Sequence, residues 1–297
     1  MYSTGNGDVS IPHRLFNRRG LGYQSAMDGH FESVDGMTLL DEGDGAPFDL
    51  LRPDAGSRAI LVCDHASNRI PSRLGDLGLP RDIIEDHVGW DIGAESVTRI
   101  LSERLDATAI ICGYSRLVID CNRPPGSPAS IPETSDGYLI PGNQALSRGE
   151  RAAREREILE PYHGAISREV AGRWQDGLPP ALVSIHSFTP ALKADGRPRP
   201  WQICILWGHD GRIAQPLMEN LALTPEITVG DNVPYSGLHV AYTVNIHGHA
   251  AGLPHVGIEI RQDLIATPEG AAHWARVLQE ALAPVLANHH LYQARHF

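Results

Sequence analysis

Two histidines at the ends of short apolar runs are the first candidates for chemistry in this chain. Residues 59–64 lead to His65, and residues 181–185 lead to His186, 121 positions further along. Both runs have strand character, and in a mainly parallel sheet the side chains beyond the carboxyl ends of neighbouring strands line a shared crevice. The two imidazoles could therefore bind one metal ion, since a catalytic zinc takes three protein ligands and leaves a position for water.

The third ligand of such a site stays open from the residues alone. No HExxH or HxxE motif occurs in the chain. Carboxylates are available from Asp64 and Asp91, and a further pair, His247 and His249, would share one face of an extended strand. His249 is also a candidate for contact with a substrate. The sequence therefore predicts a metal site without deciding its full set of ligands.

A third apolar run, residues 255–261, carries a carboxylate that is expected to be shielded from water. Glu259 lies between two isoleucines, and burying a carboxylate without a partner is costly. Either Arg261 or another cation neutralises it structurally, or it faces the crevice as a general base that takes a proton from the attacking water and delivers it to the leaving nitrogen. We favour the base, because desolvation raises the pKa of a carboxyl group toward neutral pH.

Groups suited to binding a carboxylate lie between the two histidines. An arginine fork makes two parallel hydrogen bonds to a carboxylate, and a neighbouring amide adds a directed donor. Asn122 and Arg123 are therefore predicted to bind a substrate, with Arg116 as a further contributor. Asp120 would hold one of these arginines in place. The alternative is that Asp120 and Arg123 form an ordinary structural ion pair.

Strands alternate with helices around these residues, which predicts an α/β fold with a mixed, mostly parallel sheet covered on both faces. The expected strands are about residues 59–64, 108–112, 117–121, 181–186, 202–207, 226–229, 240–246 and 256–261. The expected helices are about residues 93–105, 148–174, 211–221 and 268–287. Ser147 with Glu150 forms a capping box, Thr267 caps the last helix, and Pro161 is expected to bend or restart the second.

Two segments lack regular periodicity. Residues 124–141 contain five prolines, which excludes regular structure there, and ordered loops of this length are often binding lids. Residues 1–45 are rich in Gly, Asp and Ser and are predicted to be an irregular N-terminal extension. Residues 46–297 are then expected to form a single domain.

Composition narrows the class of protein. With 25 Lys and Arg against 36 Asp and Glu, the formal charge is −11, which argues against a nucleic-acid partner and against binding to anionic membranes. The four cysteines show no CxxC spacing, which fits reduced, buried thiols in a cytoplasmic protein. No segment approaches ~18 consecutive apolar residues, and no export signal is recognisable. We therefore expect a cytoplasmic protein.

Taken together, four runs resemble the N-formylglutamate amidohydrolase family, and the resemblance extends from about residue 47 to about residue 287. The runs are CDHASNRIP at 63–71, DCNR at 120–123, SIHS at 184–187 and IEIRQD at 258–263. The resemblance implies a three-layer α/β/α fold like that of zinc exopeptidases, about one zinc ion per chain, and hydrolysis of the N-acyl amide of a small acidic amino acid, best N-formyl-L-glutamate. The Asp-x-Asn-Arg run is also similar to the carboxylate-binding motif of related deacylases.

The related deacylases take their first two metal ligands from a His-x-x-Glu motif. This chain has Asn68 at the position of that glutamate. The predicted metal ligands are His65, His186, Asn68 and Asp91. The predicted catalytic residue is Glu259. The predicted substrate-binding residues are Asn122, Arg123, Arg116 and His249.

Two other functions are compatible with the same residues. A zinc peptidase on this fold would act on longer substrates, and a protein that has lost its metal would bind amino-acid-like ligands without turnover. A serine hydrolase is not favoured, because no GxSxG motif is present.

Overall fold

The computed structural model describes residues 37–192, 196–237 and 241–297. The predicted N-terminal extension, residues 1–45, therefore lies mostly outside the described residues. From residue 37 onward the chain is in contact with the sheet domain. Leu39 is buried, and the amides of Leu39 and Leu40 each donate a hydrogen bond of 2.9 Å to the Glu157 carboxylate.

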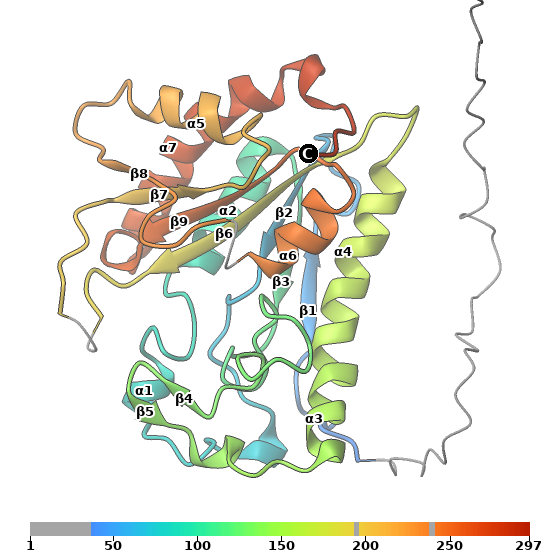
Figure 1. Ribbon diagram of the computed structural model, residues 1–297, viewed down its shortest axis with the longest axis vertical. Coiled ribbons are helices and arrows are strands. Elements are labelled where there is room, and N and C mark those ends of the chain that lie inside the picture. Colours follow the sequence, from blue (N-terminus) through green and yellow to red (C-terminus); the bar gives the residue numbers. More distant parts are fainter. Residues whose placement is uncertain (1–36, 193–195, 238–240) are drawn as a thin grey trace, which may run out of the picture. The chain divides into compact units, whose positions relative to one another are not determined.

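A seven-stranded sheet lies at the centre of the described chain, in the order β1-β3-β2-β6-β9-β7-β8 (Figure 1). Its strands are β1 (Phe48–Leu51), β2 (Ala59–Cys63), β3 (Thr108–Cys112), β6 (Ala181–Phe188), β7 (Ile203–Leu206), β8 (Val229–Asp231) and β9 (His255–Arg261). Strands β3, β2, β6 and β9 are parallel to one another, whereas β1 is antiparallel to β3 and β7 is antiparallel to β9. The predicted mixed, mostly parallel sheet is confirmed.

Helices cover both faces of this sheet (Figure 1). One face carries α2 (Ala94–Leu105), α5 (Ala214–Leu221) and α7 (Pro268–Leu286), and the other carries α3 (Arg148–Arg154), α4 (Glu160–Arg173) and α6 (Tyr242–Val244). Side chains alternate between the faces along each strand: Leu61 packs with α2 and α7, and Ile60 packs with α4. The short helix α1 (Arg81–Ile84) lies in a connection. The hairpin of β4 (Thr134–Ser135) and β5 (Tyr138–Leu139) lies within residues 124–141, so the prediction that this segment has no regular structure is wrong.

The helix signals of the sequence are confirmed. Ser147 and Glu150 form the capping box of α3, and the Thr267 hydroxyl accepts a hydrogen bond from the Gly270 amide at the start of α7. Between α3 and α4 the chain makes a π-helical turn, Glu155–Leu159, just before Pro161. A wider turn at this point accommodates a proline, because its ring cannot donate the regular helical hydrogen bond.

The predicted strand over residues 117–121 is wrong, because this run lies in turns after β3. Its carbonyl groups are bound by side chains rather than by a neighbouring strand. Asn143 Nδ2 donates to the Leu117 carbonyl at 2.8 Å, and Arg154 Nη1 donates to the Val118 carbonyl at 2.9 Å. The apolar side chains of the run are buried on the α4 side of the sheet. Burial of this kind anchors a turn as well as it would a strand.

The predicted strand over residues 240–246 is also wrong. Residues 238–240 lie outside the described residues, and the chain then forms α6 and a π-helical turn, Asn245–His249. The idea that His247 and His249 share one face of a strand fails with it, because side chains two apart on a helical turn point in different directions. In the part of the chain that the structure describes, no helix is long and apolar enough to cross a bilayer.

Gly93 allows the loop that carries Asp91 to pack closely against the segment that follows β9. Gly93, at the start of α2, has φ +80°, and a Cβ built on it would lie 2.2 Å from the Ile265 carbonyl oxygen. Both the backbone conformation and the close approach exclude a side chain here.

We predict that Gly93→Ala destabilises the protein by roughly 2 kcal/mol more than Gly177→Ala, because alanine at 93 adds a backbone clash to the cost of a positive φ. Gly177 is the matched control, since its φ is +74° and nothing lies within 4 Å of its added Cβ. The free energy of unfolding from denaturant titration measures both. Equal losses in the two variants would show that the contact with Ile265 relaxes at no cost.

Candidate active site

The carboxyl ends of three parallel strands bring the chemically active side chains to one place. His65 follows β2 by two residues, His186 lies in β6, and Glu259 lies in β9 directly opposite His186 in the strand register. Alternation explains why Glu259 can face a crevice while both neighbouring isoleucines are buried in the core on the opposite face. The ring centroids of His65 and His186 are 5.0 Å apart, close enough for both rings to reach one ion.

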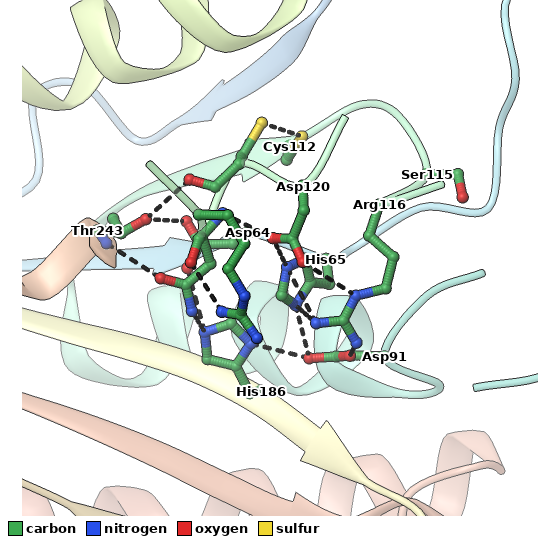
Figure 2. A network of polar contacts seen from close by, with 12 residues as sticks. Asp64, His65, Asp91, Cys112, Ser115, Arg116, Asp120, His186 and Thr243 are labelled. Carbon is green, nitrogen blue, oxygen red and sulfur yellow. Dashed lines mark hydrogen bonds and ion pairs between the residues drawn. The ribbon is translucent and has the colours of Figure 1, made fainter. Parts of the chain in front are cut away.

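Asp91 contacts both imidazoles, as Figure 2 shows. Its Oδ2 atom is 2.8 Å from Nδ1 of His186 and 3.4 Å from Nδ1 of His65. The loop before α2 places it there, because the Asp91 amide donates to the His65 carbonyl and the Ala94 amide donates to the Asp91 carbonyl. All three side chains are buried, and one ligand atom from each lies within 4.8 Å of the others. This group could hold a metal ion.

Each imidazole has a second carboxylate on its other nitrogen. Nε2 of His65 is 2.7 Å from Oδ1 of Asp120, and Nε2 of His186 is 3.1 Å from Oδ2 of Asp64. An ionised carboxylate only accepts hydrogen bonds, so in each pair the Nε2 atom carries the hydrogen. Both Nδ1 atoms lie on the side of Asp91. Nδ1 of His186 donates to the ionised Asp91 carboxylate, and it would offer a lone pair to a metal ion only after losing that hydrogen.

Close pairing of opposite charges sets the ionisation of this buried group. Burial alone would raise the pKa values of Asp64 and Asp91, but neighbouring cations outweigh it. His186 lowers the pKa of Asp64 to about 2, and Arg116 and His65 hold the pKa of Asp91 well below its usual range. Burial would lower the pKa of His186, yet the hydrogen bonds to Asp64 and Asp91 keep it well above its usual range. The carboxylates are therefore ionised at neutral pH.

Arg116 belongs to this charge group. Its Nη1 atom donates to Oδ1 of Asp91 at 3.1 Å, and its Nη2 atom donates to Nδ1 of His65 at 2.8 Å. Asp120, which we expected to hold an arginine in place, has its Oδ2 atom 3.7 Å from Nε of Arg116 and makes its shortest contact with His65.

Asn122 and Arg123 follow in the turn after Asp120. The Asn122 amide donates to Oδ1 of Asp120 at 2.9 Å, which fixes the turn. The side-chain oxygen of Asn122 accepts a hydrogen bond of 3.0 Å from the Thr243 amide, and its Nδ2 atom lies 3.4 Å from Nε2 of His186. Arg123 is half-buried, and its Nη1 atom donates to the Asn122 carbonyl. Both side chains line the same cavity as the histidines.

Glu259 faces this cavity rather than an arginine partner. Arg261 binds Asp263 at 2.8 Å instead, so Arg261 is not the cation that neutralises Glu259. Burial raises the pKa of Glu259 to about 7, against the opposing influence of His186.

The cavity has a volume of about 1000 Å³. The two histidines, Asp91 and Glu259 line it, and residues 126–136 of the proline-rich segment form much of the rest of its wall. The segment is tied to the Asp91 loop by a contact of 3.0 Å between His87 Nε2 and Asp136 Oδ2. The expectation that residues 124–141 cover a binding site is consistent with this wall.

Two predicted site residues do not lie at this cavity. Asn68 is half-buried and is not among the described residues that line it. His249 instead lies near His209 and His255, with ring centroids 6.3 and 5.9 Å away. Sequence reasoning also missed Thr243, because nothing in its local sequence signals a contact with residues more than a hundred positions earlier.

Comparisons with known proteins identify the family and related structures. A model of the family described as N-formylglutamate amidohydrolase matches residues 57–266. A gene product of Agrobacterium tumefaciens has a similar structure, with a TM-score of 0.80 and 39% sequence identity over 84% of this chain and 98% of that chain. An N-formylglutamate amidohydrolase from Ralstonia eutropha shares the fold, with a TM-score of 0.61 and 22% identity over 81% of this chain and 97% of that chain.

No curated protein sequence matches the chain. The family match nevertheless spans most of its length and includes both histidines, Asp91, the Asp120–Arg123 turn and Glu259. The chain therefore belongs to the N-formylglutamate amidohydrolase family.

Proposed function

We propose that this protein hydrolyses the N-acyl amide bond of a small acidic amino acid in a zinc-dependent reaction, with N-formyl-L-glutamate as the best single substrate. The observation that carries the proposal is the Asp91 carboxylate between the Nδ1 atoms of His65 and His186, with Glu259 beside them on the same face of the sheet. Membership of the family supports the choice of substrate.

The residues present fit a catalytic zinc site. Imidazole nitrogen and carboxylate oxygen are common zinc ligands, and three of them suffice for a catalytic ion. We assign these ligands to His65, His186 and Asp91, and we leave Asn68 out because it lies away from the cavity. The carboxylates on both Nε2 atoms support the assignment, because ligating histidines usually donate their other N–H to such a partner. When bound, zinc would polarise the amide carbonyl and lower the pKa of a water molecule.

The remaining residues bind the substrate and move the proton. Arg123 and Asn122 would bind a substrate carboxylate, so that binding energy remote from the amide sets its approach. Glu259 would take a proton from the attacking water and deliver it to the leaving nitrogen. Arg116, held by Asp91 at the cavity wall, would stabilise the negative charge that develops on the carbonyl oxygen. We no longer include His249 in the mechanism.

A peptidase acting on longer N-acylated or peptide substrates is the second candidate. The observation in its favour is the cavity of about 1000 Å³, which is at the upper end for small-molecule sites. Rates with N-formylglutamate, other N-acyl amino acids and short peptides compared under identical conditions would separate the two functions.

We predict that the purified protein carries about one zinc ion per chain and loses activity on chelation. Asp91→Ala should abolish zinc binding, whereas Asn68→Ala should retain it, because only Asp91 lies between the two histidines. Elemental analysis after size-exclusion chromatography measures this. Full activity in a sample free of metal would end the zinc proposal. Loss of zinc from Asn68→Ala but not from Asp91→Ala would identify Asn68 as the third ligand.

We predict that Glu259→Gln keeps its zinc and loses turnover by a factor of about 10²–10⁴, because it removes the proton acceptor without removing a metal ligand. Since the base acts in its ionised form, wild-type kcat/KM should fall as the pH falls through the pKa of Glu259. That pKa is about 7, and a bound cation would shift it lower. A glutamine variant with near wild-type kcat would exclude this role.

We predict that Arg123→Ala raises KM for N-formylglutamate by about 10- to 100-fold with a smaller effect on kcat, because it removes a charge-assisted hydrogen bond to the substrate carboxylate. Arg123→Lys should recover only part of the loss, since lysine keeps the charge but not the fork. Steady-state kinetics on folded, zinc-loaded variants measures both. An unchanged KM in Arg123→Ala would place the carboxylate elsewhere.

A further inference from the structure

Thr243 contacts both Asp64 and Asn122 in the candidate active site. It is fully buried in α6. Its hydroxyl donates to Oδ1 of Asp64 at 2.7 Å, and its amide donates to Oδ1 of Asn122 at 3.0 Å. Figure 2 shows Thr243 on the side of Asp64 away from Asp91. One residue thus contacts the partner of a proposed zinc ligand and a proposed substrate-binding amide.

Asp64 depends on a complete set of donors because it is a buried carboxylate. Oδ1 accepts from Thr243 and from the Tyr162 hydroxyl at 2.9 Å, while Oδ2 lies 3.1 Å from Nε2 of His186 and 3.3 Å from the Ser184 hydroxyl. Losing a donor leaves part of a buried charge unsatisfied. The carboxylate would then shift toward its remaining partners, and His186 is one of them.

The π-helical turn that directly follows α6 is fixed to α4 by a contact between His247 and His163. Nε2 of His163 donates to the Cys121 carbonyl at 2.9 Å, because a carbonyl can only accept. The neutral His163 ring then accepts at Nδ1 from Nε2 of His247, also at 2.9 Å. Burial lowers the pKa of both rings, that of His247 to about 4, so the neutral pairing holds at neutral pH. The bond to Cys121 also fixes the residue directly before Asn122.

We propose that Thr243 is a positioning residue for the reaction: its hydroxyl sets the orientation of Asp64 and hence of His186, while its amide sets the orientation of the Asn122 side chain. The inference rests on the proposed function for its catalytic meaning. Its effect on metal binding is independent of which substrate the protein hydrolyses.

The test separates the hydroxyl of Thr243 from general packing. Thr243→Val removes the hydroxyl and keeps the shape and the backbone amide, and Thr243→Ser keeps the hydroxyl. Thr98→Val is the matched control, because Thr98 is equally buried and its hydroxyl donates to the Ala94 carbonyl within α2 at 2.8 Å. Each variant is prepared free of metal and titrated with Co²⁺, whose visible spectrum reports ligand geometry, and kcat and KM are measured on the zinc-loaded forms.

We expect Thr243→Val to bind Co²⁺ about 10-fold more weakly, at the low end for loss of an outer partner of a metal ligand, and to show an altered spectrum. Its kcat should fall while KM stays near the wild-type value, because the amide that holds Asn122 is retained. Thr243→Ser should restore affinity and spectrum. Thr98→Val should lose stability without changing either. If the valine variant does not fold, Thr243→Ala serves in the same comparison.

Wild-type Co²⁺ affinity and kcat in Thr243→Val would overturn the proposal. So would a joint change of affinity, KM and stability that serine does not restore, because that result would mean the whole turn had moved. A wild-type protein that binds Co²⁺ but does not hydrolyse N-formylglutamate would contradict the proposed function only. The affinity comparison would still decide the role of Thr243.

Discussion

The Asp91 carboxylate, shared between two imidazoles at the ends of parallel strands, is the interaction on which the site depends. Without Asp91, the buried Nδ1 sides of His65 and His186 would lose the anion that they share with Arg116. Asp91 reaches them because its loop is bound to the His65 backbone and because a glycine allows close approach to the end of β9. The metal proposal therefore depends on a loop as much as on the two strands.

Around Asp91, buried charged side chains contact partners of opposite charge. Each imidazole has Asp91 on one nitrogen and a second carboxylate, Asp120 or Asp64, on the other. Asp64 is satisfied in turn by hydroxyl groups from α4, β6 and α6. Such an arrangement fixes ring orientation and tautomer, which a catalytic metal requires. It also explains why elements on the α4 side of the sheet contribute to a site whose proposed ligands come from β2, β6 and the loop before α2.

Strand ends and a proline-rich segment both line the cavity. Strand ends supply the part of the wall that carries His186 and Glu259, and residues 126–136 of the proline-rich segment supply much of the rest. Prolines limit the conformations of that segment without requiring a strand or helix. The side chains of Arg154 and Asn143 bind the carbonyl groups of the neighbouring turn, so the backbone that leads to Asn122 and Arg123 is held by α3 and a short helical turn.

Local pattern by itself determined the α/β class, the main strands and helices with their caps, and the place of His65, His186 and Glu259 at strand ends. These follow from alternation, helical periodicity and capping residues, which act over a few neighbouring positions. Only the tertiary structure decided that Asp91 rather than Asn68 lies between the histidines, that residues 117–121 form turns, and that Thr243 is on a helical turn behind Asp64. Each of these outcomes depends on which distant donor satisfies a buried polar group, and that choice is made by packing, not by sequence spacing.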